Sequence, residues 1–258
     1  MRITSLAENT STSPEILSEH GLSLFIETEK MNILFDMGQT DIFHQNAEKL
    51  GIDLSSADIA ILSHGHYDHG GGISKFLALN EKASIYANRR VFERYYHGCD
   101  KYIGLDPSLK ECGRFVFTDD TVSICDGITL YSCNERVRSH ELGSFGLTVL
   151  EDGIFFPDRF LHEQYLLIEE NGRRILISGC SHKGILNITE WFYPDVLIGG
   201  FHFSGLSLDS TLERYAEILS TYDTDFYTCH CTGTDQYEFM KKHMTRLRYL
   251  TGGQSIEI

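Results

Sequence analysis

The chain has 258 residues, of which 37 are acidic and 22 are basic, so its formal net charge is −15 with histidine counted as neutral. This excess of negative charge excludes a basic nucleic-acid-binding protein. With 41% hydrophobic residues, 12% aromatic residues and only four prolines, the composition is that of an ordinary globular protein with a sizeable core.

The first half of the chain predicts strands and helices in alternation. Apolar residues alternate across residues 22–35 on both sides of a polar turn at 29–30, which predicts a β-hairpin. A helix is expected over residues 41–52, where apolar residues recur at helical spacing before a glycine. The almost continuously apolar run 57–63 predicts a buried inner strand.

That strand leads directly into the sequence HGHYDHGGG, residues 64–72. Its three consecutive glycines allow a tight turn before a helix that we expect near residues 73–77. A short strand, ASIYAN, is expected next, at 83–88. Residues 88–114 are rich in Tyr, Phe and Arg without a clean period, so we expect a variable, irregular and partly helical insertion that covers a neighbouring site.

From Phe115 onward, short apolar runs predict the strands of a second half. A helix is expected near residues 212–219, followed by a short strand, another helix near 239–240 and a terminal strand. The second half therefore repeats the architecture of the first without a linker between them, and we expect one domain over residues 1–258. The runs that predict its strands are 114–117, 121–125, 128–133, 164–170 and 173–180.

Four potential metal ligands lie within six residues after the buried strand: His64, His66, Asp68 and His69. Loops at the carboxyl ends of strands usually hold the ligands of layered α/β folds. Because residues i and i+2 of an extended segment point the same way, His64 and His66 can reach one ion. Asp68 and His69, in the turn that follows, can reach a second. An isolated histidine is more often a surface or core residue, but four such ligands together predict a zinc-type site.

The sequence HGHYDHGGG resembles the HxHxDH signature of the metallo-β-lactamase superfamily, and the preceding FDMG, residues 35–38, resembles the Asp-Gly at the strand end upstream of it. The strand before the motif and the glycines after it agree with this family. The resemblance implies an α/β fold, a four-layer αββα metallo-β-lactamase-like sandwich of two similar halves, with metals at one edge. It leaves the reaction open.

Three further segments resemble one branch of that superfamily, whose named member is an archaeal synthase that joins a pterin to ribofuranosylaminobenzene phosphate in methanopterin biosynthesis. The resemblance extends from about residue 21 to 253 and is weakest across 88–151, where substrate contacts are expected. The three segments are residues 162–188, 195–205 and 229–233.

Carried over residue by residue, the resemblance assigns His64 and His66 to a first metal site. Asp68 and His69 are assigned to a second site, which His230 completes. In the common superfamily pattern a third histidine and a bridging aspartate follow, and here His162 and Cys180 stand at those places. A thiolate at Cys180 would favour zinc over manganese or magnesium, and the alternative is a small buried packing residue.

His182 is the preferred remaining ligand of the first site, and His162 is the alternative. If His162 is not a ligand, we expect it to contact Glu163 or to orient another ligand. His202, in GGFHFSG, resembles an active-site histidine of the branch that contacts substrate or acts as an acid; the alternative is a structural role. Cys229 and Cys231 flank His230 and are expected to be packing residues. No partner spacing assigns a role to His20, His44, His97, His140 or His243.

This pattern favours a metal-dependent hydrolase that acts on a small, phosphorylated or other ester-type substrate through a metal-activated hydroxide. Asp68 and His202 are the catalytic candidates, with Asp68 orienting the nucleophile and His202, or a bound water, protonating the leaving group. The expected cofactor is zinc, as two ions, with manganese or iron as alternatives. A synthase or transferase of pterin or phosphoribosyl type is one alternative function, and a non-catalytic metal or redox sensor is another.

The expected location of the protein is the cytoplasm. The N-terminus lacks the basic and apolar segments of a secretory signal, and the best candidate span, residues 196–208, is shorter than the ~20 residues that a bilayer requires. Seven cysteines are an odd number and too few for a disulfide scaffold. We expect a small-molecule substrate and no nucleic-acid or membrane partner, while the sequence leaves the oligomeric state open.

Overall fold

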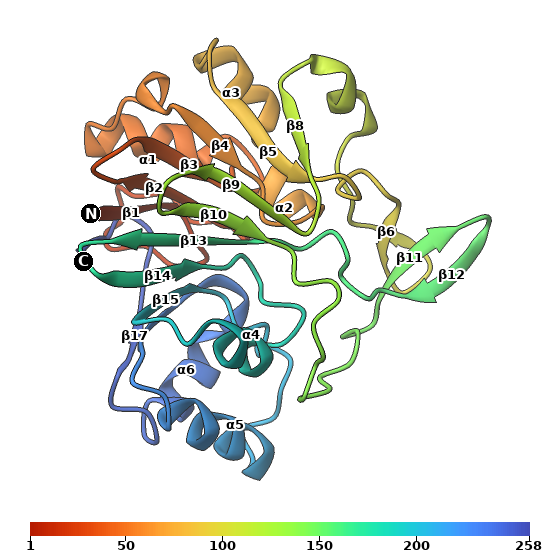
Figure 1. Ribbon diagram of the computed structural model, residues 1–258, viewed down its shortest axis with the longest axis vertical. Coiled ribbons are helices and arrows are strands. Elements are labelled where there is room, and N and C mark those ends of the chain that lie inside the picture. Colours follow the sequence, from red (N-terminus) through yellow and green to blue (C-terminus); the bar gives the residue numbers. More distant parts are fainter.

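Two seven-stranded β-sheets lie face to face in the computed structural model, which describes residues 1–258. Helices cover the outer face of each sheet, so the fold has four layers in the order helix, sheet, sheet, helix (Figure 1). The four-layer αββα sandwich expected from the sequence is confirmed. The helices are α1 (Ile42–Leu50) and α3 (Ile73–Leu79) on the first sheet, and α4 (Ile185–Phe192), α5 (Ser210–Ser220) and α6 (Thr234–Met240) on the second. The single turn α2 (Tyr67–Gly70) lies in the loop after β4.

The first sheet has the strand order β18-β1-β2-β3-β4-β5-β8. Strands β2 and β3 form the predicted hairpin, with Leu24 opposite Phe35. The run from β3 to β8 is parallel, so the loops that follow these strands meet at one edge. The strands are β1 (Arg2–Ala7), β2 (Ser23–Glu27), β3 (Asn32–Phe35), β4 (Ile59–Ile61), β5 (Ser84–Asn88), β8 (Phe115–Thr118) and β18 (Ser255–Glu257).

The second sheet has the strand order β17-β16-β15-β14-β13-β10-β9. Strands β13 and β14 form a hairpin whose turn, Asn171 and Gly172, has φ of 53° and 73°, as a tight hairpin turn requires. From β14 to β17 the strands are parallel. The strands are β9 (Thr121–Cys125), β10 (Ile128–Tyr131), β13 (Tyr165–Glu170), β14 (Arg173–Ile177), β15 (Val196–Gly199), β16 (Asp225–Thr228) and β17 (Leu247–Tyr249).

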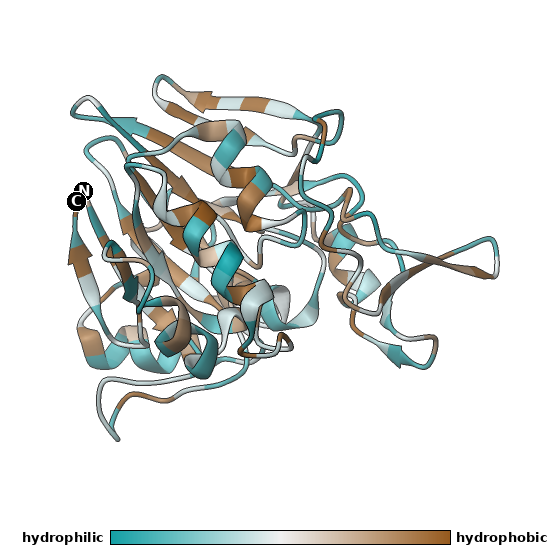
Figure 2. Ribbon diagram, turned by 90° about the horizontal axis from the view of Figure 1, so that it is seen from below, coloured by the Kyte–Doolittle hydropathy of each residue, from teal (hydrophilic) through white to brown (hydrophobic).

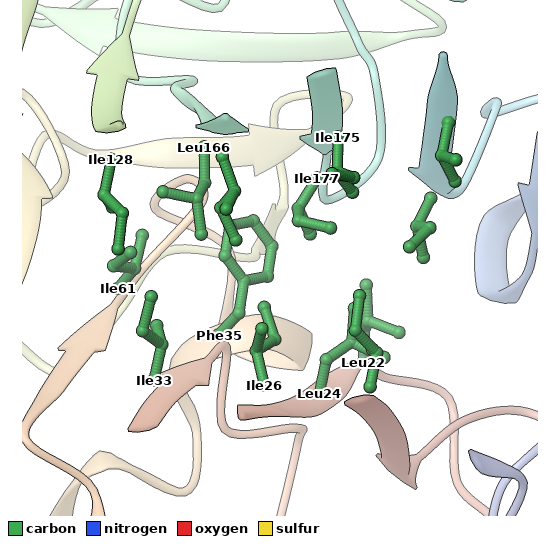
Figure 3. Close-up of a cluster of buried hydrophobic side chains, with 14 of the residues drawn as sticks. Leu22, Leu24, Ile26, Ile33, Phe35, Ile61, Ile128, Leu166, Ile175 and Ile177 are labelled. Atoms are coloured by element: carbon green, nitrogen blue, oxygen red, sulfur yellow. The ribbon is translucent and has the colours of Figure 1, made fainter. Parts of the chain in front are cut away.

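The main core lies between the two sheets, where one face of each strand points toward the other sheet (Figure 3). Leu24 and Phe35 of the first sheet and Leu166 and Ile177 of the second belong to this cluster of 19 buried residues. Two further apolar clusters cover the outer faces, one between the first sheet and its helices and the other between the second sheet and its helices. None of the helices is long and apolar enough to cross a bilayer.

A third, smaller sheet projects from the sandwich and is called the arm below (Figures 1 and 2). It has the order β12-β11-β6-β7 and joins two separate parts of the chain. Its strands are β6 (Tyr95–His97), β7 (Lys101–Tyr102), β11 (Leu147–Glu151) and β12 (Ile154–Pro157). The insertion at 88–114 is partly helical, as expected, with the 3₁₀ helix Pro107–Cys112, but its two strands and their partner strands at 147–157 were not expected.

Other elements also differ from the expectation. Strand β8 belongs to the first sheet, because the chain crosses over and pairs Ile85 with Phe115 in parallel, whereas we expected it in the second half. Strand β1 and helix α4 were not expected. The C-terminal part forms two strands, and the last of them, β18, returns to the first sheet and pairs with β1.

Candidate metal centre

The side chains expected at the site lie at the edge where the parallel strands of both sheets end. The loop with residues 64–69 follows β4, Cys180 follows β14, His202 follows β15 and His230 follows β16. These residues are buried, apart from the half-buried Tyr67 and His202. The topology thus brings segments that are distant in sequence to one place.

The carboxylate of Asp36 organises the loop after β4. It is fully buried and accepts hydrogen bonds of 2.7 Å from the Ser63 N–H, the Ser63 hydroxyl and the His69 Nδ1. Because the Ser63 hydroxyl gives its proton to Asp36, it accepts a hydrogen bond from the His64 Nδ1, 2.8 Å away. The His64 Nε2 therefore has a free lone pair, and this atom is buried without a hydrogen-bond partner.

His64, His66 and His182, called the imidazole cluster, bring their ligand nitrogens within 4.8 Å of one another. The Nε2 of His66 is also buried without a partner. Burial, together with repulsion from neighbouring imidazoles, holds the pKa of His64 and of His66 well below its usual range. Both rings are therefore neutral, which is the form of imidazole that binds a metal.

Glu163 fixes the third member of that cluster. Its carboxylate accepts hydrogen bonds from the His182 Nδ1 at 3.2 Å and from the His182 N–H at 2.7 Å. The Tyr165 hydroxyl donates to it at 2.5 Å. Burial alone would raise the pKa of Glu163, but the hydrogen bond and charge of His182 and the charge of Lys183 lower it far below its usual range. The ionised carboxylate keeps the His182 proton on Nδ1 and leaves Nε2 free.

His162 lies beside the imidazole cluster, but both of its nitrogens already have partners. Its Nδ1 accepts a hydrogen bond from the Gly65 N–H at 2.8 Å, and its Nε2 lies 3.1 Å from Asp158 Oδ2. The geometry thus brings His182 to the cluster and gives His162 the role of holding the loop. The contact that we expected between His162 and Glu163 is replaced by the one between His182 and Glu163.

Asp68, His69, Cys180 and His230 form a second group, called the mixed cluster. The Nε2 atoms of His69 and His230 face each other at 3.2 Å. Each ring donates from Nδ1, His69 to Asp36 and His230 to the Asn9 Oδ1 at 2.7 Å. Two neutral rings held in this way would point lone pairs at each other, which is repulsive unless a proton or a cation lies between them.

A proton can take that place. Burial opposes protonation of His69, but the carboxylates of Asp36 and Asp68 outweigh it and raise the pKa of His69 to about 9. The buried imidazolium can then donate from Nε2 to His230. A metal ion that binds here must displace this proton.

The carboxylate of Asp68 completes the mixed cluster. Its Oδ2 lies 3.4 Å from the His230 Nε2, 3.8 Å from the His69 Nε2 and 3.3 Å from the His20 Nε2. Burial would raise the pKa of Asp68, but these imidazoles hold it well below its usual range. His20 is therefore a residue of the site, contrary to the expectation. It arrives from the loop before β2, and no short-range spacing in the sequence signals this approach.

Two cysteines lie close to these nitrogens. The Cys180 Sγ is 3.1 Å from the His69 Nε2. The ligand atoms of Cys180, His230 and Cys231 lie within 4.8 Å of one another. Cys229 packs in the core between the sheets, as expected, but the same expectation for Cys231 is wrong. Residues His230–Thr232 form a 3₁₀ turn, so the alternation of an extended strand does not apply to them.

A cavity of about 410 Å³ opens over both clusters, within the usual size range of small-molecule sites. The arm supplies one wall with Lys101 and Leu147, together with Ile103 and Phe145, which lie next to it in the chain. This agrees with the expectation that the insertion covers a site. The full lining is His20, His66, Tyr67, Asp68, His97, Lys101, Ile103, Phe145, Leu147, Cys180, His182, His202, Ser204, Gly205, Leu206, His230 and Cys231.

His202, which follows β15, also lines this cavity, and its backbone has the left-handed conformation with φ of 55°. Its ring centre is 4.5 Å from those of His182 and Phe145, and its Nδ1 is buried without a partner. A strained backbone at a non-glycine residue is typical of functional sites. His97 also lines the cavity, although no role was expected for it.

The family model described as "Metallo-beta-lactamase superfamily" matches residues 19–218. The chain belongs to the metallo-beta-lactamase superfamily. Its fold is therefore that of a family of metal-dependent hydrolases.

Two curated relatives from Methanocaldococcus jannaschii are each 30% identical to this chain. One is the uncharacterized protein MJ0448, which aligns with 88% of this chain and 89% of its own length. The other is named 7,8-dihydropterin-6-methyl-4-(beta-D-ribofuranosyl)-aminobenzene-5'-phosphate synthase, and the alignment covers 93% of this chain and 90% of the synthase. The branch identified from the sequence is thereby confirmed.

Among solved structures, Tm1679, described as a metal-dependent hydrolase of the beta-lactamase superfamily, superposes with a TM-score of 0.85 at 29% identity. The match covers 100% of this chain and 99% of Tm1679. The metallo-beta-lactamase fold protein YhfI from Bacillus subtilis superposes with a TM-score of 0.63 at 12% identity, covering 100% of this chain and 98% of YhfI, which shows the shared fold alone.

Proposed function

We propose that this protein is a metal-dependent hydrolase that cleaves a small anionic ester by attack of an activated water. The observation that supports this most strongly is the convergence of imidazole lone pairs. The Nε2 atoms of His69 and His230 face each other at 3.2 Å, and those of His64 and His66 are buried without partners. One cation at each pair would satisfy all four nitrogens, and the cation at His69 and His230 would displace the proton that otherwise lies between them.

The distances fit divalent ions. Tetrahedral ligands bound at about 2.0–2.1 Å lie about 3.3 Å from one another. The His69 and His230 nitrogens are 3.2 Å apart, and the Asp68 Oδ2 is 3.4 Å from His230 Nε2. We assign a first ion to the imidazole cluster and a second to the mixed cluster. Zinc suits this set of nitrogen, oxygen and sulfur donors, and manganese or iron are the alternatives.

Ions held there would lower the pKa of a coordinated water toward ~7 and polarise the ester oxygen. The ionised Asp68 would accept a hydrogen bond from the attacking water and orient it. His202, whose ring lines the cavity, would protonate the leaving group. His20, beside Asp68 at 3.3 Å, would help to keep that carboxylate ionised.

The cavity lining supports an anionic substrate with an apolar body. Asp68 is the only carboxylate that lines the cavity, although the chain has a net charge of −15. Lys101 supplies a positive charge at the arm, and Ile103, Phe145 and Leu147 supply an apolar wall. A phosphorylated or carboxylated aromatic ester suits both features, whereas the overall charge would repel a long polyanion.

The test combines elemental analysis of the purified protein with chromogenic phosphodiesters, phosphomonoesters and lactones as substrates. We expect bound zinc, turnover of at least one class, and incorporation of solvent ¹⁸O into the product. His66→Ala should abolish turnover, while the matched control His243→Ala, outside the cavity, should retain it. Undiminished turnover by His66→Ala would contradict the proposal.

A synthase of pterin or phosphoribosyl type is the second candidate, because the named synthase is 30% identical over 93% of this chain. In that case the same metals and the same anion-binding site would bind a phosphorylated ribose unit, and a condensed product would form. Product mass separates the two functions, since hydrolysis adds the elements of water and condensation joins two substrates. Metal binding without turnover of any substrate would instead support a sensor.

A further inference from the structure

We infer that Cys231 is a metal ligand beside Cys180, so that the mixed cluster presents two sulfur atoms and selects a thiophilic divalent ion. The inference rests on the metal binding proposed above and extends it to a residue whose position in the sequence indicates only packing. It concerns the identity of the second ion.

The surroundings of the buried cysteines separate them into two kinds. Cys229 and Cys133 belong to apolar core clusters, where a thiol acts as a small hydrophobic group. Cys180 and Cys231 are equally buried, at 2% and 4% exposure, but belong to none of the apolar clusters. They line the cavity together with imidazoles instead.

The backbone holds the Cys231 sulfur in this place. The His230 N–H donates to the buried Glu8 carboxylate at 2.6 Å, and the Cys231 carbonyl accepts from the Ser204 N–H at 3.0 Å. A Cβ at Gly200 would lie 2.3 Å from the Cys231 Sγ, so only glycine leaves room for the sulfur there. The turn is thus fixed at both ends, and its thiol lies between the Gly200 backbone and the Cys180 carbonyl, to which it donates a hydrogen bond at 3.6 Å. A metal ion would replace the proton of that hydrogen bond.

The donor atoms around this point suit a soft cation. The Cys180 Sγ lies 3.1 Å from the His69 Nε2, and the ligand atoms of Cys180, His230 and Cys231 lie within 4.8 Å of one another. Each thiol would lose its proton to solvent as the metal–sulfur bond forms. Two thiolates favour zinc, cadmium or cobalt and disfavour magnesium and manganese, which prefer oxygen.

Zinc-loaded protein without substrate provides the test. X-ray absorption should show sulfur at about 2.3 Å from zinc, with two sulfur atoms for every two zinc ions. Cys231→Ala should halve the sulfur signal and weaken one of the two zinc sites by more than ~100-fold in chelator competition, beyond the loss typical of an outer-shell change. The matched control is Cys229→Ala, which removes a thiol from the same loop on the core side and should keep both properties.

An unchanged sulfur signal and zinc affinity in Cys231→Ala would overturn the inference, as would a single sulfur per two zinc ions in the unmodified protein. If Cys231→Ala fails to fold, Cys231→Ser, which nearly preserves the volume, replaces it. Cobalt-loaded protein gives a second readout, because thiolate-to-cobalt absorption should fall by half in either variant. Two sulfur ligands without turnover would refute only hydrolysis, and turnover without a Cys231 ligand would refute only this inference.

Discussion

The floor of the cavity, formed by the imidazole and mixed clusters, and the arm that walls it differ in how firmly their side chains are held. In the floor, Asp36 and Glu163 each fix the rings that donate to them. In the arm, Ile154 and Phe156 are 58% and 44% exposed, and the strands of this sheet pair only with one another. The chemical groups are therefore preorganised, whereas the recognition wall is a separate small sheet.

This difference indicates how the two parts divide the work. A metal ligand must be placed within tenths of an ångström, which needs hydrogen-bonded partners around it. An apolar wall needs only shape and size. Substitutions in the floor should therefore change metal content and turnover together, whereas substitutions in the arm should change substrate preference alone.

The largest effect is expected from removing the metals. His66→Ala, or treatment with a chelator, should lower kcat by on the order of 10³-fold or more, because the proposed hydrolysis depends on a metal-activated water. Added zinc or manganese should restore the chelated protein but not the variant. Full activity in a metal-free sample, checked by elemental analysis, would contradict the proposal that the floor supplies the chemistry through metal ions.

A smaller loss is expected from Glu163→Gln. The amide cannot hold the His182 proton on Nδ1 as firmly, so zinc affinity of the imidazole cluster should fall by about 10–100-fold. Chelator competition measures this. The matched control Glu190→Gln, a half-buried residue of α4 outside the cavity, should leave the affinity unchanged. Equal losses in both variants would indicate a general effect on folding instead.

A third change probes the arm. Lys101→Met should raise KM for an anionic ester by about 5-fold while kcat stays the same, since an exposed ion pair contributes roughly 1 kcal/mol. A neutral ester of the same shape should show no difference. Lys110→Met, an exposed residue outside the cavity, serves as the control. A fall in kcat or in zinc content would contradict the assignment of Lys101 to recognition.

The smallest effect is expected at the tip of the arm. Ile154→Ser should change the free energy of unfolding by less than ~0.5 kcal/mol, because the side chain is 58% exposed. Ile61→Ala, in the core between the sheets, should cost about 2–5 kcal/mol. Denaturant unfolding of both variants measures the contrast. A comparable loss at Ile154 would show that the arm is part of the stable core.

The part of the site that could be predicted from the sequence is the part encoded by short-range spacing. His64, His66, Asp68 and His69 lie in one loop, and the apolar run before them identifies the strand that carries the loop. The approach of His20 to Asp68 depends on long-range packing, which has no local pattern. Cys231 was misassigned because a 3₁₀ turn replaced the extended chain that the alternation assumes.

The fold shows the same limit. Alternating and helical periods predict the hairpin at 22–35, helix α1 and the strands β13 and β14. The spacing of apolar residues along a strand does not indicate which sheet the strand joins, so β8 was assigned to the wrong half. The arm was missed because its strands are short and their partners lie about fifty residues away, at 95–102 and 147–157.

One carboxylate, Asp36, connects the two clusters. It holds His69 directly and His64 through the Ser63 hydroxyl, so its orientation affects a ring in each. Ions at the two proposed sites would therefore be linked through this one carboxylate. Such linkage is reciprocal, because each ion would change the affinity for the other by the same factor. Occupancy of one proposed site should therefore alter the affinity of the other.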